Sequence, residues 1–304
     1  MYDTIIIGAG PAGIAASIYA ARKKMNALLI SSDIGGQINT TWGIENYIGY
    51  HFIEGPELIE KFNTQLATYP IEQQIGVKVN GIKKIKNGFS ITTDENKTYQ
   101  AKTLVYATGK KPRKLNVPGE AEYTGKGVTY CATCDGPLFS GKKVAVIGGG
   151  NSALEAVLDL SKYAAHIDLI SLTQLTADRV LIDKLSDIKD LMIHLEHSVK
   201  SIEGEQFVSG LAIENLKTQK TQKVGVAGIF VEIGLVPNSE LLKGIVKLNE
   251  YGEIPVNCSG ETGIEALYAA GDVTDVPEKQ IAVAVGEGVK AVLRAHRYLQ
   301  RLQG

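Results

Sequence analysis

The sequence predicts an α/β protein with two Rossmann-like nucleotide-binding domains, the second inserted in the first. A short apolar strand leads through a glycine-rich turn into a helix at the start of the chain, and the same layout returns about 140 residues later. One further strand and a long helix follow only near the C-terminus, where they would complete the first unit. The 304 residues suffice for about two domains, each with its own core.

The first unit spans residues 2–31. Apolar, mostly β-branched residues at 2–7 predict a strand, and the turn Gly-Ala-Gly-Pro-Ala-Gly follows at 8–13. An alanine-rich stretch predicts a helix to about Lys23, and a second strand is expected at 27–31. This is the strand–turn–helix–strand order of a βαβ unit.

The second unit repeats that order. A strand at 144–147 runs into Gly-Gly-Gly-Asn-Ser-Ala at 148–153, a helix extends to about Tyr163, and a strand follows at 167–171. Gly148, Gly150 and Ala153 take the places of Gly8, Gly10 and Gly13. One such turn can arise for backbone reasons alone, but two between a strand and a helix favour nucleotide binding.

The glycines of these turns have separate physical roles. The first permits the tight turn, the second lets a pyrophosphate approach the backbone, and the third lets the helix pack on the strand. The helix N-terminus then offers unpaired N–H groups and a partial positive charge to the phosphates.

The rest of the chain predicts a discontinuous first domain. The remaining expected elements are a helix at 55–69, antiparallel strands around the turn signals at 87–88 and 94–96, a buried strand ending at 107–109, a second antiparallel insertion at about 198–224, a strand at about 266–272 and a helix at about 279–302. We therefore expect one domain at 1–113 and 246–304 and the other at 114–245, with Pro112 and Pro118 marking a linker.

Composition excludes several classes of function. Hydrophobic residues make up 44%, charged residues 21%, and the formal net charge is -1, so nothing favours nucleic acid or an anionic membrane as a partner. No apolar run approaches the roughly 20 residues of a membrane span. The N-terminus lacks the features of a signal peptide, and three cysteines do not make a secreted disulfide framework. A cytoplasmic protein is expected.

Two cysteines stand in the sequence Cys131-Ala-Thr-Cys134-Asp135. A zinc site would need about two further ligands at suitable spacing, and the histidines supply no such pattern, so no metal site is expected. A single C-x-x-C beside βαβ units is more often redox-active. Cys258 stands alone, and we expect it to be a small, at least half-buried residue without a redox role.

These landmarks in this order resemble the low-molecular-weight thioredoxin reductases over the whole chain. The resemblance rests on GAGPAG (8–13), GGQ (35–37), ENYIG (45–49), ATG (107–109), CATCDGPLF (131–139), GGGNSA (148–153), and AAGD followed by KQI (279–281). From about Thr129 the chain is also similar to the C-terminal part of the flavoprotein subunit of alkyl hydroperoxide reductase. That flavoprotein carries an additional N-terminal thioredoxin-like module, which has no counterpart in this sequence.

The resemblance implies FAD on the first domain. Gly8, Gly10 and Gly13 would face its pyrophosphate. The other residues expected to line the cofactor are Pro11, Ala12, Ser31, Gly36, Gln37, Asn46, Val79, Ala107, Thr108, Gly109, Gly271, Asp272, Lys279, Gln280 and Ile281.

The resemblance also implies the roles of the redox motif. A C-x-x-C spacing permits a small disulfide that opens without unfolding the protein. Cys134 would be the flavin-side sulfur, Cys131 would attack the disulfide of thioredoxin or a thioredoxin-like protein, and Asp135 would be the acid/base. Relatives rotate the smaller domain between two positions, which places hinges near 112–117 and 241–247, and they suggest a homodimer.

The second nucleotide site departs from the NADPH-dependent pattern. Those relatives carry an H-R-R-x-x-x-R cluster after the second strand, whereas this chain has Ser171, Leu172 and Thr173, with no charge before Asp178. Without cations a 2′-phosphate loses hydrogen bonds worth about 1.5–3 kcal/mol each. The nearest cation, Arg179, is expected on the next helix. The donor is therefore expected to be NADH, or ferredoxin as in the ferredoxin-dependent flavin thioredoxin reductases, rather than NADPH.

Other functions remain open at this stage. One is an NAD(P)H-dependent reductase of a peroxiredoxin system. A ferredoxin–NADP reductase of the same fold would not need a C-x-x-C, so the motif argues against it. A flavin-bearing redox sensor without turnover is the non-enzymatic alternative, which the altered nucleotide site alone supports.

Overall fold

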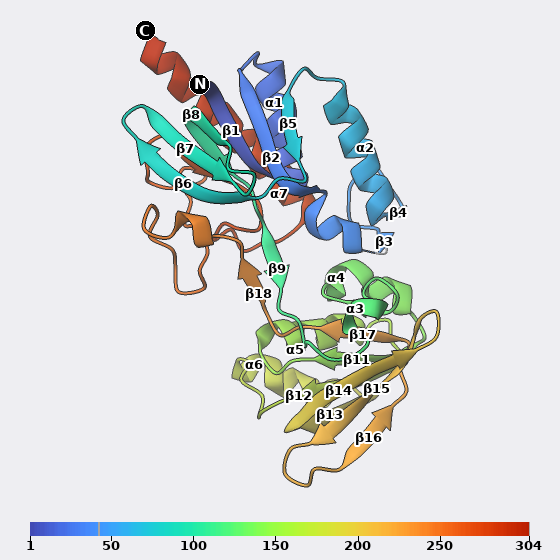
Figure 1. Cartoon of the computed structure of the whole chain (residues 1–304). Helices are drawn as coiled ribbons and strands as arrows, with labels where there is room; N and C mark the ends of the chain where they lie inside the picture. Colours follow the sequence, from blue (N-terminus) through green and yellow to red (C-terminus); the bar gives the residue numbers. More distant parts are fainter. Residues whose placement is uncertain (42, 304) are drawn as a thin grey trace.

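The structure is a computed structural model that describes residues 1–41 and 43–303. Figure 1 shows a larger body, which holds both chain ends, and a smaller body, joined by two crossing strands. Both bodies are built on a twisted, mainly parallel sheet, which confirms the predicted α/β class. Gly304, the last residue of the expected first domain, lies outside the described residues.

The larger body is built on a seven-stranded sheet. Its order is β5-β2-β1-β8-β7-β6, and β19 pairs with β8. The strands are β1 (Tyr2–Ala9), β2 (Ala27–Ile34), β5 (Glu72–Ile75), β6 (Val79–Ile85), β7 (Gly88–Thr93), β8 (Thr98–Tyr106) and β19 (Leu267–Ala269). β1, β2, β5, β8 and β19 run parallel, while β6 and β7 form the predicted antiparallel insertion.

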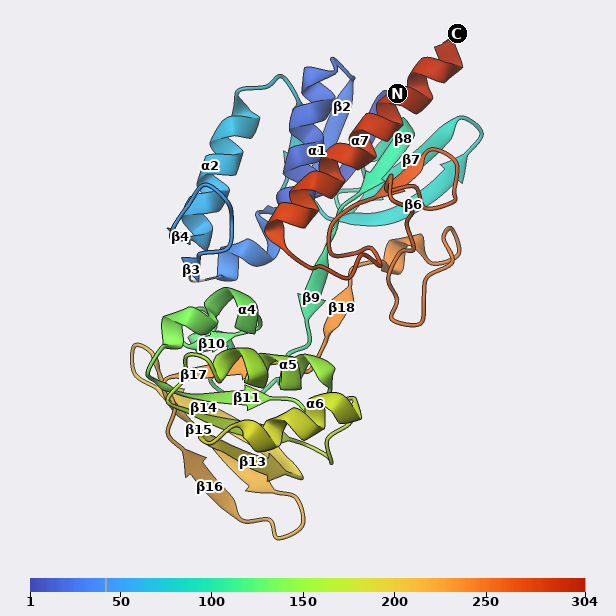
Figure 2. The same ribbon diagram turned by 180° about the vertical axis from the view of Figure 1, so that it is seen from behind.

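Helices cover one face of this sheet, where α1 packs along α7 (Figure 2). The helices are α1 (Pro11–Arg22), α2 (Gly55–Ala67) and α7 (Ile281–Gln303), with short segments η1 (Gly36–Thr40), β3 (Gly43–Ile44), β4 (Ile53–Glu54) and η4 (Glu240–Leu242). α7 begins two residues after the predicted start at Lys279, because Lys279 and Gln280 belong to the loop before it. The C-terminal strand and helix thus complete the N-terminal unit, as the sequence predicts.

The smaller body carries a five-stranded parallel sheet of order β10-β17-β11-β12-β13. Its strands are β10 (Val128–Thr129), β11 (Lys143–Ile147), β12 (His166–Ser171), β13 (Leu191–Leu195) and β17 (Gly228–Val231). Its helical segments are α3 (Glu120–Tyr123), α4 (Ala132–Asp135), η2 (Gly136–Phe139), α5 (Asn151–Leu160), α6 (Arg179–Lys184) and η3 (Leu185–Asp187). The antiparallel strands β14 (His197–Gly204), β15 (Val208–Asn215) and β16 (Thr221–Val224) cover the face opposite α5.

The two bodies are joined by β9 (Lys110–Pro112) and β18 (Leu235–Pro237), which pair antiparallel in the middle of the molecule (Figure 1). Leu242 and Val246 pack in the core of the larger body. We therefore place the second crossing at 235–237, before the hinge expected at 241–247, because apolar burial fixes the later residues to the larger body.

Two further findings concern the chain as a whole. The burial predicted for Cys258 is wrong: the residue is exposed in a surface loop. Within the part of the chain that the structure describes, no helix is both long and apolar enough to span a bilayer.

Candidate active site

The disulfide predicted to be redox-active lies in a single helical turn. Cys131 and Cys134 are bonded to each other, with their Cα atoms 5.3 Å apart. Cys131 is the N-cap of α4, and its Sγ accepts the backbone N–H of Cys134 at 3.2 Å. Both cysteines are half-buried. Because the bridge closes a loop of two intervening residues, its opening need not disturb the rest of the fold.

This turn lies on the side of the smaller body that faces the larger one. α4 is next to β3 of the larger body, and Figure 1 shows it directly below β3 and η1. The disulfide is therefore held where the two bodies meet.

Asp135 ends α4 and is buried. Thr129 Oγ1 donates a hydrogen bond to its Oδ2, whereas its buried Oδ1 has no partner among the described residues. Burial raises the pKa of Asp135 to about 6, although the Thr129 hydrogen bond partly offsets the effect. A carboxyl group in this range can both hold and release a proton near neutral pH.

Glu232 is a second carboxyl group at this turn, and sequence reasoning missed it. It directly follows β17, and its Oε1 accepts the backbone N–H of Ala132 at 3.3 Å. Burial raises the pKa of Glu232 to about 7; the Ala132 hydrogen bond lowers it, and the charge of Glu155 adds to the rise. The available signal was its position as the charged residue in the apolar run 228–236.

The glycine-rich turn between β1 and α1 has the shape of a phosphate cradle. A Cβ atom on Gly13 would lie 1.7 Å from the carbonyl oxygen of Gly8, so the tight turn requires glycine there. A Cβ on Gly10 would meet no protein atom within 4 Å. Gly10 therefore lines open space at the N-terminus of α1, and Pro11 and Ala12 begin that helix.

Other expected cofactor residues converge on the same region from distant segments. Gln37 Nε2 donates to Asp272 Oδ2 at 3.3 Å, and Asn46 Nδ2 donates to Gln280 Oε1 at 3.2 Å. Gly36 lies beside Gly10, and Gly271 packs against Ala12. Ala107, Thr108 and Gly109 follow β8 at the carboxyl edge of the sheet, and Ile281 begins α7.

Two expected cofactor residues have structural contacts of their own. Ser31 is buried, and its Oγ accepts the backbone N–H of Ala9 at 3.0 Å. Val79 begins β6 and packs in the core of the larger body. Both remain near the sheet edge, but neither offers a hydrogen-bonding group as accessible as those of Asn46 and Asp272.

A small cluster of charges lies beside Asp272. Lys110 and Lys279 both contact Glu253 Oε1, at 2.5 and 3.5 Å, and Lys279 Nζ also donates to the Thr274 carbonyl at 2.6 Å. Burial raises the pKa of Asp272, while the charges of Lys279 and Lys110 and a hydrogen bond from Gln37 oppose the rise. Burial and the charge of Lys110 lower the pKa of Lys279.

These features fit FAD. Gly10 leaves room for a pyrophosphate at a helix N-terminus, while amide and carboxyl groups suited to a ribityl chain and a flavin ring stand along one edge of the sheet. FAD bound there would supply two-electron chemistry. The side chains that would hold it are those of Gln37, Asn46 and Asp272.

The second glycine-rich turn is covered by its own chain. Thr176 donates its backbone N–H to the Gly149 carbonyl at 2.8 Å. Asn151 Nδ2 donates to Asp178 Oδ2 at 2.9 Å, and the Asp178 N–H returns a bond to Asn151 Oδ1 at 2.8 Å. Segment 172–178 is thereby tied to the turn and to the start of α5, where a dinucleotide would bind.

No cation stands at the expected place in this second site. Ser171 is buried, and its Oγ packs against Gly149. Arg179 begins α6 as predicted, but its side chain is exposed and pairs with Asp183 on the same helix at 3.0 Å. A 2′-phosphate would lack charge-assisted hydrogen bonds here.

Polar clusters elsewhere do not form a metal site. His194 Nε2 lies 2.7 Å from Asp168 Oδ1, and His166 Nε2 lies 3.4 Å from Asp168 Oδ2, on neighbouring strands. Across residues 1–41 and 43–303, however, no group of three or more His, Cys, Asp or Glu side chains could hold a metal ion.

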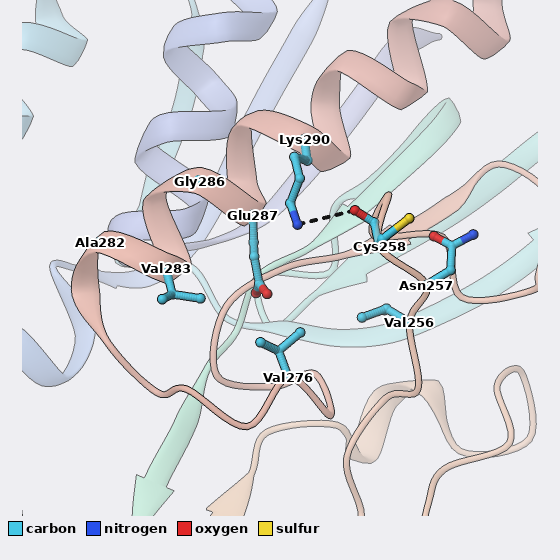
Figure 3. A pocket seen from close by; sticks show the side chains of 9 residues that line it. All are labelled: Val256, Asn257, Cys258, Val276, Ala282, Val283, Gly286, Glu287 and Lys290. Carbon is cyan, nitrogen blue, oxygen red and sulfur yellow. Dashed lines mark hydrogen bonds between the residues drawn. The ribbon is translucent and has the colours of Figure 1, made fainter.

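A surface pocket of about 570 Å³ lies on the larger body, away from the disulfide (Figure 3). It is open and lies between α7 and the loop around Cys258, and Lys290 donates to the Cys258 carbonyl at its rim. Its lining has neither the glycine turn nor the redox turn. The chemistry therefore belongs to the edge where the bodies meet.

The combination of two glycine turns and a C-x-x-C disulfide is matched by a known family. The family of pyridine nucleotide-disulphide oxidoreductases matches residues 2–288. This chain belongs to that family. Members are disulfide oxidoreductases, and the family implies FAD as the cofactor, in agreement with the cradle on the larger body.

Among curated relatives, the chain is similar to the F-type flavoprotein of alkyl hydroperoxide reductase from Staphylococcus aureus, with 40% identity over 301 residues. The match covers 99% of this chain and 59% of that protein, so the chain spans about three fifths of the relative's length.

Solved structures of thioredoxin reductases share the whole fold. The Streptococcus pyogenes enzyme is 36% identical, with a TM-score of 0.94 and 99% coverage of both chains. The Lactococcus lactis enzyme in its FR conformation is 34% identical, covers 99% of this chain and all of its own, and has a TM-score of 0.69. These matches confirm the predicted resemblance to thioredoxin reductases.

Proposed function

We propose that this protein is an FAD-dependent thioredoxin reductase, which passes electrons from a donor through FAD to the Cys131–Cys134 disulfide and on to thioredoxin or a thioredoxin-like protein. The observation that supports this most is the position of the disulfide. It lies on a turn of the smaller body that packs next to β3, on the side where the residues suited to FAD converge.

The residues around the disulfide would divide the work. Cys134 would exchange electrons with the flavin, and Cys131 would attack the disulfide of the substrate protein. Asp135, with its pKa raised to about 6, would exchange a proton with the sulfur that leaves. A thiolate is the reactive form of cysteine, so control of these protons controls the rate.

The donor proposed here is ferredoxin or NADH rather than NADPH. The covered glycine turn, the buried Ser171 and the surface ion pair of Arg179 support this choice, because a 2′-phosphate would find no cation. Each charge-assisted hydrogen bond lost would weaken NADPH binding by about 1.5–3 kcal/mol, or roughly tenfold to a hundredfold.

Anaerobic reduction of the FAD-loaded protein tests the donor. Equal concentrations of NADPH, NADH or reduced ferredoxin are added, and bleaching of the visible flavin band is followed. Bleaching by reduced ferredoxin or NADH at rates well above that with NADPH is expected. Rapid bleaching by micromolar NADPH would contradict the donor proposal, while the disulfide chemistry could still stand.

A second candidate function is reduction of a peroxiredoxin system through a separate thioredoxin-like protein. The 40% identity to the S. aureus alkyl hydroperoxide reductase flavoprotein favours it. Turnover of purified thioredoxin is compared with turnover of a peroxiredoxin in the presence and absence of a thioredoxin-like carrier. Efficient turnover of the carrier–peroxiredoxin pair, with poor turnover of thioredoxin, would favour this candidate.

A further inference from the structure

Glu232 links the parallel sheet of the smaller body to the redox turn. Its backbone N–H donates to the Ile147 carbonyl at 2.8 Å, which fixes it beside the last residue of β11. Its side chain reaches α4 and accepts the N–H of Ala132, the residue that directly follows Cys131. The carboxyl group is therefore held by the fold next to the sulfur that is proposed to attack the substrate.

The surroundings of Glu232 contain no compensating cation. Among the ion pairs of residues 1–41 and 43–303, none involves Glu232. The charged group that acts on it is Glu155 of α5, which is also acidic. On α4 itself the titratable groups are Cys131 and Cys134, when reduced, and Asp135, whose Oδ2 is bound by Thr129. Burial, without a counter-charge, raises the pKa of Glu232 to about 7.

We propose that Glu232 is a positioning residue of the redox turn that takes up a proton when the disulfide is reduced, and so sets the reactivity of Cys131. This inference rests on the proposed function, because it assumes that Cys131 and Cys134 cycle between disulfide and dithiol. It adds a second proton-exchanging carboxyl group to Asp135.

The proton balance gives the reason. Reduction breaks the sulfur–sulfur bond, and two electrons come from the reduced flavin or, in the test below, from a dithiol reagent. Two protons are taken up if both sulfurs become thiols, and one if a thiolate remains. A thiolate at Cys131 disfavours an ionised carboxylate nearby, so Glu232 binds a proton as the thiolate forms. The neutral carboxyl group can still accept the Ala132 N–H through its carbonyl oxygen.

The test measures the reactivity of Cys131 alone. Cys134→Ser leaves one thiol in the turn, and E232Q is made in that background, because glutamine keeps the shape and the acceptor of the carboxyl group but cannot ionise. Iodoacetamide modification is followed between about pH 5.5 and 9 through the mass of peptide 127–142, which lies between Lys126 and Lys142 and excludes Cys258.

The protein with Glu232 is expected to show two inflections in its rate profile, one from the thiol and one near pH 7 from Glu232. The E232Q protein is expected to show the thiol inflection alone. Near pH 7.5 its Cys131 is expected to react about three- to fivefold faster, the effect of removing one nearby charge screened as in water.

Two further variants make the result specific. E155Q removes the neighbouring acidic charge and is expected to move the inflection near pH 7 to lower pH without abolishing it. E122Q, on the exposed surface of α3, is the matched control and is expected to leave the profile unchanged.

An unchanged profile in E232Q would overturn the inference. If circular dichroism shows that E232Q does not fold, an inflection that stays in place in E155Q overturns it instead. The proposed function is tested separately on the protein with both cysteines. If an excess of dithiothreitol does not reduce its Cys131–Cys134 bond, the proposed function fails, whatever the Cys134→Ser profiles show.

Discussion

At the residue scale, the environment of each carboxyl group decides its chemistry more than its place in a motif. The sequence indicated Asp135 because it follows the second cysteine, and the structure adds its burial and its bond from Thr129. Glu232 lies about 100 residues away from that motif, so only the fold brings it to Ala132. Sequence reasoning could not find it, since no local pattern connects a strand end with a distant helical turn.

Asp135→Asn is expected to reduce disulfide turnover by about 10²- to 10⁴-fold, because the proton donor is lost. The same change is expected to stabilise the fold above pH 6. The pKa of Asp135 is raised to about 6, so the native state binds its proton more tightly than the unfolded state. Wild-type stability therefore falls as pH rises from about 4 through 6, and that fall is smaller in the variant.

Chemical denaturation at pH 5 and pH 8 checks this difference alongside steady-state turnover. Asp183→Asn is the control, since Asp183 lies on the surface and pairs with Arg179. A variant that keeps wild-type turnover would remove Asp135 from the mechanism. An identical stability change at both pH values would contradict its raised pKa.

At the element scale, the strands and the long helices were predictable, whereas the short elements were not. The glycine turns stand out because each lies between an apolar strand and a periodic helix, and the helix at α2 shows the expected buried face with Leu58, Ile59 and Leu66. The crossing strands β9 and β18 have three residues each, too few for any periodicity. Likewise, nothing local indicates that segment 172–178 folds back on the second glycine turn.

Gly10→Ala tests the cofactor cradle of the larger body. The added Cβ meets no protein atom within 4 Å, so the stability of the FAD-free protein should change by less than about 0.5 kcal/mol. The methyl group would stand between the backbone and a pyrophosphate, so FAD affinity should fall about tenfold or more. Thermal unfolding of the apoprotein and a fluorescence titration with FAD measure the two effects.

Gly225→Ala is the matched control, because its Cβ also meets open space but lies on the smaller body. It should leave both quantities unchanged. FAD affinity equal to that of the wild type in Gly10→Ala would show that the pyrophosphate does not bind at this turn.

Lys110→Met tests the anchor of the crossing strand β9. Burial raises the pKa of Glu253, but hydrogen bonds from Lys110 and Asn249 outweigh it and hold that pKa below its usual value. Losing Lys110 is therefore expected to lower the free energy of unfolding by about 1–3 kcal/mol at pH 7. Because the bond requires an ionised carboxylate, the loss should shrink as pH falls through the lowered pKa of Glu253.

Lys111→Met is its control, since Lys111 is exposed and stands 3.8 Å from Glu240. Urea unfolding at pH 7 and pH 4 compares the two variants, and Lys111→Met should cost less than about 0.5 kcal/mol. Equal losses in both variants would mean that the buried Lys110–Glu253 pair does not anchor the strand.

At the scale of the whole molecule, the order of elements was predictable and the arrangement of the two bodies was not. A repeated βαβ signature and a returning C-terminal helix dictate two sheets, but the angle between them depends on a few residues at β9 and β18. The S. pyogenes and L. lactis enzymes are similarly identical to this chain yet differ in TM-score, 0.94 against 0.69. We propose that rotation about the crossing strands carries the disulfide from the FAD site to the partner protein.

The most direct test of this account is photoreduction of bound FAD in the absence of oxygen and of any external donor. The account predicts that light-driven reduction of the flavin yields free thiols at Cys131 and Cys134, read by alkylation and peptide mass, while the flavin returns to its oxidised colour. A flavin that stays reduced beside an intact Cys131–Cys134 bond, or a protein that binds no flavin, would contradict it.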